Sequence, residues 1–208
     1  MSSRWPIVAV IGSTQALAWA SSFYLPAVLA VPMARDLGLT PAWVYASLSF
    51  GLGVSAFLGP LAGRLIDGRG GRNVLCTSNA LFVAGLLVLA LARGSVSLFG
   101  AWLLLGIAMA AGLYEPAFAT LTRLYGKDSR APITGITLIA GFASTIGWPT
   151  SAFLEHQFGW RGACVGWAVL HIVLGFPLNA WALRHPPPDL ERELGQSPAG
   201  SGCAERYS

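Results

Sequence analysis

The sequence predicts an all-α integral membrane protein with six transmembrane helices. Of its 208 residues, 54% are hydrophobic and only 11% are charged, and the mean hydropathy is +0.60. A soluble domain has about a quarter charged residues, so this chain has too few charges to cover a surface that faces water. The charges also fall in clusters between apolar runs, each long enough to span a bilayer at about 17 to 25 residues. Since backbone groups in hydrocarbon must be paired within each run, the runs are expected to be helices.

The expected spans follow one another with short connections, and together they make one membrane domain over residues 1–184. They cover residues 6–30, 43–63, 74–92, 97–119, 132–153 and 162–184. The first follows Arg4 and continues past the small residues before Ser21 as far as Ala30. That run is too long for a cleaved signal peptide, so it is expected to remain as the first span.

The later spans are bounded by charge or by composition. A stretch with three arginines, GRLIDGRGGR, separates the second span from the third, and Arg93 separates the third from the fourth. The fourth contains Glu115, the fifth is rich in glycine and serine, and the sixth contains His171. Residues 185–208 have too little apolar surface to pack, so they are expected to form a flexible cytoplasmic tail.

Cysteine usage supports neither a disulfide framework nor a metal site. The three cysteines, Cys76, Cys164 and Cys203, show no CxxC spacing, and the first two lie inside expected spans. Cysteine at such positions behaves as a small hydrophobic residue. The chain is expected to bind no metal and no cofactor.

The distribution of positive charge predicts the orientation in the membrane. If the N-terminus is cytoplasmic, ten of the 13 Lys and Arg residues lie on the cytoplasmic side and three on the other. The three are Arg35, Arg93 and Arg161. The positive-inside rule therefore places both termini in the cytoplasm of a multi-pass protein of the plasma (inner) membrane. The basic residues are divided among short loops, so no nucleic-acid partner is expected.

A weak internal repeat appears when the sequence is shifted by 89 residues. Pro60 then coincides with Pro149, Leu65 with Leu154, and RGGR at 69–72 with FGWR at 158–161. An offset of three spans reverses the orientation in the membrane. The repeat therefore predicts two inverted three-helix units, an arrangement typical of secondary transporters.

The loop between the second and third spans resembles a known signature. It reads Gly63-x-x-x-Asp67-x-x-Gly70-x-Arg72 on the expected cytoplasmic side, and it is similar to the signature loop of the major facilitator superfamily. FGWR before the sixth span, Tyr114-Glu115-Pro116 and the fifth-span run ITGITLIAGFASTIGWP resemble the same family. The resemblance covers residues 6–184 and implies one six-helix half of a transporter.

The resemblance implies a function for the loop and also has limits. It implies a cytoplasmic gating loop formed by Gly63, Asp67, Arg69, Gly70 and Arg72, which would hold two transporter halves together and release them during transport. The alternative is a tight turn that only anchors the helices.

Departures from the family pattern include Gly68 and Gly71 at usually basic positions, Trp102 in place of an arginine, and six spans where a typical member has twelve.

Two ionisable side chains inside spans, Glu115 and His171, are candidates for coupling transport to protons or for a charge relay. Placing a polar group inside a membrane costs free energy, so such a residue is expected to have a function. Glu115 is placed toward the cytoplasmic end of the fourth span. It could couple transport to protons or pair with Arg72 beneath the loop. His171 lies near the middle of the sixth span, where it could titrate or be satisfied by a neighbouring hydroxyl or carbonyl.

Candidate substrate-lining residues lie on the first and fifth spans. Gln15, Trp19 and Ser22 share one helical face, and they suit either a small-molecule pocket or interhelical packing. Trp148 belongs to a second stripe, with Thr137, Gly141 and Ser144, for which close packing is the preferred interpretation.

These observations predict a secondary transporter that moves a small organic solute by alternating access, with or without protons. Six helices supply one wall of such a site, so the expected partner is a second copy or a separate C-terminal half. An intramembrane serine protease would need GxSG, which is absent, so the chain is not expected to be an enzyme. The remaining alternative is a truncated fragment or membrane scaffold that transports nothing.

Overall fold

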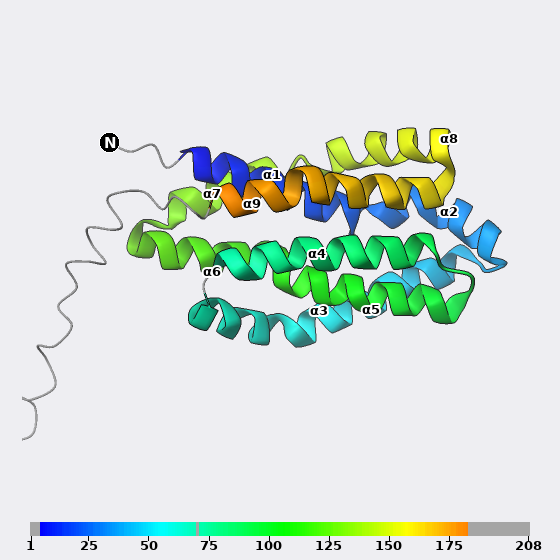
Figure 1. The fold of residues 1–208 in the computed structure, drawn as a ribbon, viewed down its shortest axis with the longest axis horizontal. Coiled ribbons are helices and arrows are strands. Elements are labelled where there is room, and N and C mark those ends of the chain that lie inside the picture. The colour runs from blue at the N-terminus through cyan, green and yellow to red at the C-terminus, as the bar shows by residue number, and fades with distance from the viewer. Residues whose placement is uncertain (1–4, 70, 183–208) are drawn as a thin grey trace, which may run out of the picture.

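The protein is a bundle of long helices that run side by side (Figure 1). This computed structural model describes residues 5–69 and 71–182, without the side chains of residues 67–69 and Arg72. Within those ranges there are helices and turns and no strand, and five segments are long and apolar enough to cross a membrane. The segments are Trp5–Leu37, Pro41–Ile66, Asn73–Ala90, Ser95–Asp128 and Arg130–Trp181. An all-α membrane fold is therefore confirmed.

The first, fourth and fifth of these segments are each interrupted, the first and fourth near their middles and the fifth nearer its start. The first consists of α1 (Trp5–Ser21) and α2 (Leu25–Leu37), joined by a turn. The fourth consists of α5 (Ser95–Gly112) and α6 (Tyr114–Tyr125), separated by Leu113 in an extended conformation, and ends in the 3₁₀ turn Gly126–Asp128. In the fifth, α7 (Arg130–Ala140) and α8 (Ala143–Leu170) are separated by Gly141 and Phe142.

Helix α8 folds back on itself. Gly159 has φ 69° and ψ 174°, a conformation that glycine adopts readily and that breaks the helix. Trp167 Nε1 donates a hydrogen bond of 3.0 Å to Ser151 Oγ, sixteen residues earlier. In a straight helix these residues would be about 24 Å apart. The chain therefore reverses near Gly159 and returns through the π-helical turn η2 (His171–Gly175) to α9 (Phe176–Ala182), as Figure 1 shows.

Several helices are longer than hydropathy predicted. The stretch from Gly63 to Arg72, which was expected to be a loop, is mostly helical. Helix α3 (Pro41–Arg69) continues to Arg69, and α4 (Gly71–Ala90) begins two residues later. The first and fourth segments also extend beyond their expected ends at residues 30 and 119. A helix pairs its own backbone groups in water as well as in hydrocarbon, so hydropathy marks where a span leaves the bilayer but not where its helix ends. The expected tail at 185–208 lies outside the described residues.

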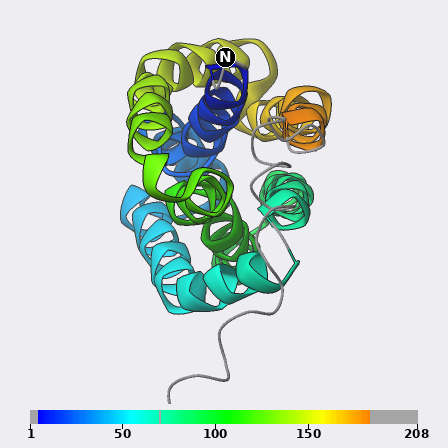
Figure 2. The same cartoon turned by 90° about the vertical axis from the view of Figure 1, so that its left-hand side faces the viewer.

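Two groups of helices make up the bundle. Helix α5 packs against α3 and α4, whereas α1 packs against α7, α8 and α9. In the view along the bundle, α1 and α6 lie between α3 on one side and α7 and α8 on the other (Figure 2). Helices α3 and α5 approach closely at Gly51 and Gly106, where a β-carbon on Gly106 would lie 2.5 Å from the Gly51 carbonyl oxygen. Small residues of this kind let membrane helices approach closely.

One end of the bundle is held by an arginine–aspartate contact. Arg161, just after the reversal in α8, forms an ion pair of 2.9 Å with Asp36 at the end of α2 and donates a 2.6 Å hydrogen bond to the carbonyl of Ala90 at the end of α4. Trp160 Nε1 donates to the same Asp36 oxygen at 3.2 Å, and the guanidinium lies 4.3 Å from the Trp160 ring centre. One side chain thus links three helix ends.

Replacing Arg161 with alanine is expected to lower the free energy of unfolding by about 1 kcal/mol, because the ion pair is half exposed while the capped carbonyl loses its partner. Unfolding by SDS titration in mixed micelles would measure it. Arg93→Ala removes an exposed side chain in the connection between α4 and α5, and it should change the free energy of unfolding by less than about 0.5 kcal/mol. Equal effects of the two substitutions would contradict the role of Arg161.

Candidate functional site

Contacts between α1, the middle of the fourth segment and α8 bring two of the helix breaks together. Gln15 on α1 donates from Nε2 to the carbonyl of Gly112, the last residue before the α5–α6 break, at 2.8 Å. A carbonyl at a helix break has lost its intrahelical partner, so the Gln15 amide replaces that hydrogen bond. On another side of α1, Gly147 of α8 lies so close to Ala20 that an added β-carbon would be 2.8 Å from the Ala20 β-carbon.

A row of aromatic rings connects these breaks. The Trp19 ring lies 5.0 Å from Tyr114 and 5.5 Å from Phe23, Tyr114 stacks on Phe118 at 5.3 Å, and the row continues from Phe23 to Tyr24 at 5.3 Å. Tyr24 in turn lies 6.4 Å from Trp148 on α8. We call this row the aromatic band; its members are Phe118, Tyr114, Trp19, Phe23, Tyr24 and Trp148. It begins on α6 directly after the α5–α6 break, passes Trp19 of α1 and the turn that contains Phe23 and Tyr24, and ends at Trp148 in α8.

The aromatic band is accompanied by two polar atoms that are buried without a hydrogen-bond partner. They are Oε1 of Gln15, whose side chain is 2% exposed, and Nε1 of Trp19. They lie one turn apart on α1, and both belong to side chains that contact the α5–α6 break. An unsatisfied buried polar group costs about 1 to 3 kcal/mol, so this pair of an acceptor and a donor is suited to a further partner.

A cavity of about 460 Å³ lies at the Trp148 end of the aromatic band, between α2 and α8. Trp148 lines it together with Ser144, Thr145 and small apolar residues of α2. Its volume is within the range of small-molecule sites, about 300 to 1,000 Å³, and it combines an aromatic wall with hydroxyl groups. Trp148 is therefore half exposed and borders a cavity. Close packing, the interpretation preferred for the stripe of Thr137, Gly141, Ser144 and Trp148, does not describe this side chain.

Ser22 differs from the two residues that share its helical face. It lies in the turn after α1 and is fully buried, and its hydroxyl donates to the carbonyl of Ala18 at 2.6 Å. The hydroxyl thus stabilises the end of α1, a local role that is common for serine beside a helix break.

Glu115 lies in the first turn of α6, directly after the break. The fourth segment continues as far as Asp128, beyond the expected end of the span at residue 119. Its side chain is exposed, and its Oε2 atom contacts the α-carbon side of Gly59 on α3. A carboxylate at this place is favoured by the positive end of the helix dipole. Glu115 was expected to pair with Arg72, but the structure does not describe the Arg72 side chain.

His171 is the first residue of the π-helical turn and is completely buried. Its Nδ1 lies 2.8 Å from Asn79 Oδ1, its Nε2 lies 2.7 Å from Ser21 Oγ, and its ring stacks on Phe82 at 4.8 Å. Asn79 Nδ2 donates to the carbonyl of Leu75, which leaves Oδ1 as the acceptor. We therefore assign the proton to Nδ1, with the Ser21 hydroxyl donating to Nε2. Both ring nitrogens are satisfied by neutral groups from α1 and α4.

The residues of the expected gating loop are divided between two helices. Gly63 lies within α3, where an added β-carbon would meet no atom within 4 Å. Asp67 and Arg69 belong to the last turn of α3 and Arg72 to the first turn of α4, while Gly70 is outside the described residues. Nearby, Arg123 of α6 donates a 2.6 Å hydrogen bond to the carbonyl of Ile66, so α6 contacts the end of α3 immediately before this region.

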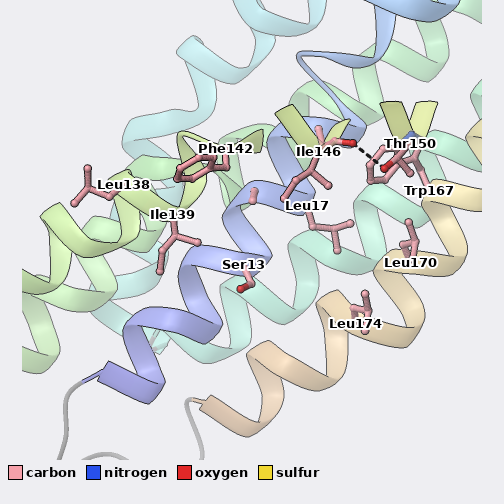
Figure 3. Close-up of a pocket in the computed structure, with 12 residues that line it drawn as sticks. Ser13, Leu17, Leu138, Ile139, Phe142, Ile146, Thr150, Trp167, Leu170 and Leu174 are labelled. Carbon is pink, nitrogen blue, oxygen red and sulfur yellow. Dashed lines mark hydrogen bonds between the residues drawn. The ribbon is translucent and has the colours of Figure 1, made fainter. Parts of the chain in front are cut away.

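A second cavity, of about 640 Å³, lies between α1, α7, α8 and the π-helical turn (Figure 3). Its lining is almost wholly apolar, and both of its hydroxyl groups bond to their own helices: Ser13 to Ala9 at 2.8 Å and Thr150 to Ile146 at 2.7 Å. A solute site needs a few polar groups that fix the ligand's orientation. Although it is the larger of the two cavities, it offers less for recognition than the aromatic band.

Comparison with known proteins agrees with this architecture. The family model described as Major Facilitator Superfamily matches residues 11–207. The chain belongs to the major facilitator superfamily. The resemblance of its loop and spans is thus confirmed. Members of this superfamily are membrane transporters, which agrees with the expectation that the chain is not an enzyme.

A curated member of the superfamily shows similarity over much of the chain. Monocarboxylate transporter 11 of Mus musculus is 33% identical over an alignment of 155 residues, and the match covers 70% of this chain. The match covers 33% of the mouse protein, so the chain spans about a third of the length of this relative.

The sequence analysis missed several residues that the superfamily fold brings together. Ser21 and Asn79, the partners of His171, received no role, although a polar residue inside an apolar run is itself a signal. Phe23, Tyr24 and Phe118 are single aromatic residues in apolar spans, a pattern that also fits contact with lipid. No local signal indicated that they form one row, because the row depends on where three helices break.

Proposed function

We propose that the chain is part of a secondary active transporter that moves a small organic solute by alternating access. The observation that carries this proposal is the aromatic band, which joins the breaks of separate membrane segments in a superfamily fold. Discontinuous membrane helices commonly form the solute site of secondary transporters, near the middle of the bilayer. The polar atoms of Gln15 and Trp19 and the cavity beside Trp148 supply recognition groups for a solute at this site.

We propose six membrane passes in two inverted units of three. The fifth segment has 52 residues, and its reversal at Gly159 supports two passes in place of one. The packing also supports the repeat, because the first helix of each unit packs against the later helices of the other: α1 against α7 to α9, and α5 against α3 and α4. A two-fold relation between the units would produce this exchange.

Six membrane passes supply one wall of such a site, so the proposal includes a second six-helix unit that faces it. This unit would be a second copy of the chain or a separate C-terminal half, and the Asp67–Arg72 region would gate the contact between the two. The proposed location is the plasma (inner) membrane with both termini in the cytoplasm, on the evidence of positive charge. Glu115, beside the aromatic band, is the group we propose for proton coupling.

The name of the mouse relative suggests the first solutes to test. Uptake of radiolabelled small monocarboxylates would be measured in proteoliposomes that contain the chain. We expect Trp19→Ala to reduce uptake at least about tenfold, since losing 1.4 kcal/mol of binding has that effect. Trp5→Ala, at the exposed start of the same helix, should leave uptake unchanged. Equal uptake by the wild type, both variants and empty liposomes would favour the non-transporting fragment or scaffold.

The native mass of the chain in nanodiscs would distinguish the two forms of the second unit. We expect a dimer that persists over a range of protein concentrations if two copies form the transporter. A persistent monomer with no uptake would assign the second unit to a separate chain.

A further inference from the structure

We propose that the site binds its solute in an uncharged form, through the hydrogen-bond acceptor Gln15 Oε1 and the donor Trp19 Nε1. This inference rests on the proposed function and specifies its solute. A complementary group has a donor and an acceptor side by side, as in an undissociated carboxylic acid or a primary amide. With the acid, the transported proton would travel on the solute itself, in place of the coupling through Glu115.

The first step is the chemistry of the two unpartnered atoms. Nε2 of Gln15 is already used by the Gly112 carbonyl, so the amide offers only an acceptor. The indole of Trp19 offers only a donor. A carboxylate anion has acceptors alone, so it can bond to Trp19 but would face Gln15 Oε1 with a like partial charge. The undissociated acid satisfies both atoms.

The second step is the charge around the site. All Lys and Arg residues whose side chains the structure describes lie near helix ends or in the connections, away from the Gln15–Trp19 face: Arg35, Arg64, Arg93, Arg123, Lys127, Arg130 and Arg161. Arg69 and Arg72, whose side chains are not described, belong to the last turn of α3 and the first turn of α4. The ionisable groups beside this face are Tyr24, Tyr114 and Glu115, and none of these supplies a positive charge. His171 contacts α1 through its Nε2 and Ser21, and its Nδ1 is hydrogen-bonded to Asn79 on α4.

The third step is the helix end that faces the site. The N-terminus of α6 would favour an anion, but Glu115 already provides a carboxylate in its first turn. A second carboxylate beside it would be disfavoured by repulsion between like charges. The rings of Trp19 and Tyr114, whose centres are 5.0 Å apart, pack against each other and form an apolar wall beside the two polar atoms, which suits an uncharged solute with an apolar body.

The test compares an acid with its amide. Binding of phenylacetic acid and of phenylacetamide to the chain in nanodiscs would be measured by calorimetry between pH 5.5 and 7.5. The acid is almost wholly ionised in this range, since carboxyl groups have pKa values near 4.3, so its apparent affinity should fall about a hundredfold. The affinity of the amide should stay constant, and it controls for titration of the protein.

A matched pair of substitutions locates the effect. Trp19→Phe keeps an aromatic ring, although a smaller one, and removes the donor, so it should weaken binding of the amide about fivefold to tenfold and change the thermal stability of the ligand-free protein much less. Trp5→Phe should change neither. Unchanged binding of the amide by Trp19→Phe would overturn the assignment of the donor.

The outcomes separate this inference from the proposed function. Binding of the acid that does not depend on pH, or binding of the acid without the amide, would show that the anion is bound and would overturn the inference while leaving transport in place. If neither compound binds and no monocarboxylate is taken up, the proposed function fails and the inference fails with it.

Discussion

Replacing Gly106 with alanine is expected to lower the free energy of unfolding by about 3 kcal/mol, the upper end of the range for overpacking. The new β-carbon would lie 2.5 Å from the carbonyl oxygen of Gly51 and 3.0 Å from the β-carbon of Val54. Both are parts of α3 that cannot rotate away, so the two helices would have to separate. SDS titration in mixed micelles would measure the change.

Gly100 provides a control on the same helix. An added β-carbon there meets no atom within 4 Å, so Gly100→Ala should raise the free energy of unfolding by about 0.5 to 1 kcal/mol through helix propensity alone. The two alanine substitutions are thus expected to have opposite signs. A change of less than about 0.5 kcal/mol for Gly106→Ala would show that α3 and α5 do not approach as closely as the structure has them.

Replacing His171 with phenylalanine is expected to lower the free energy of unfolding by about 2 kcal/mol. Phenylalanine can still stack on Phe82, but it leaves Asn79 Oδ1 buried without a donor, and an unsatisfied buried group costs about 1 to 3 kcal/mol. Ser21 loses less, because the carbonyl of Ala18 lies 3.3 Å from its hydroxyl and can accept the proton. The same titration would measure this change.

Two further variants check that the hydrogen bond to Asn79 is responsible. Changing His156, an exposed histidine on α8, to phenylalanine should alter the value by less than about 0.5 kcal/mol. Adding Asn79→Leu to His171→Phe removes both partners, so the double variant should be more stable than His171→Phe alone. If it is less stable, the effect of His171 comes from packing and not from this hydrogen bond.

The superfamily and the membrane class could be predicted because they depend on local patterns. Long apolar runs indicate spans wherever they occur, and the glycines and charges from Gly63 to Arg72 are close together in the sequence. The helix ends were less predictable. Hydropathy placed the end of the fourth span at 119, whereas the helical segment continues to Asp128.

The candidate site was predicted only in part. Periodicity placed Gln15 and Trp19 on one face of α1, and the structure places both against the break of the fourth segment. The same periodicity included Ser22, which lies beyond the end of α1 and bonds to it. A helical wheel assumes an unbroken helix, so it fails wherever the helix stops.

By itself, the sequence determined that the chain is an all-α membrane protein of this superfamily, because burial in hydrocarbon requires long apolar helices and those can be recognised locally. Only the tertiary structure decided where Leu113 and Gly159 interrupt the helices, which rings form the aromatic band, and that His171 is satisfied by Asn79 and Ser21. These features depend on contacts between residues far apart in the chain. Packing determines which broken backbone groups and buried polar atoms find partners, and no single segment carries that information.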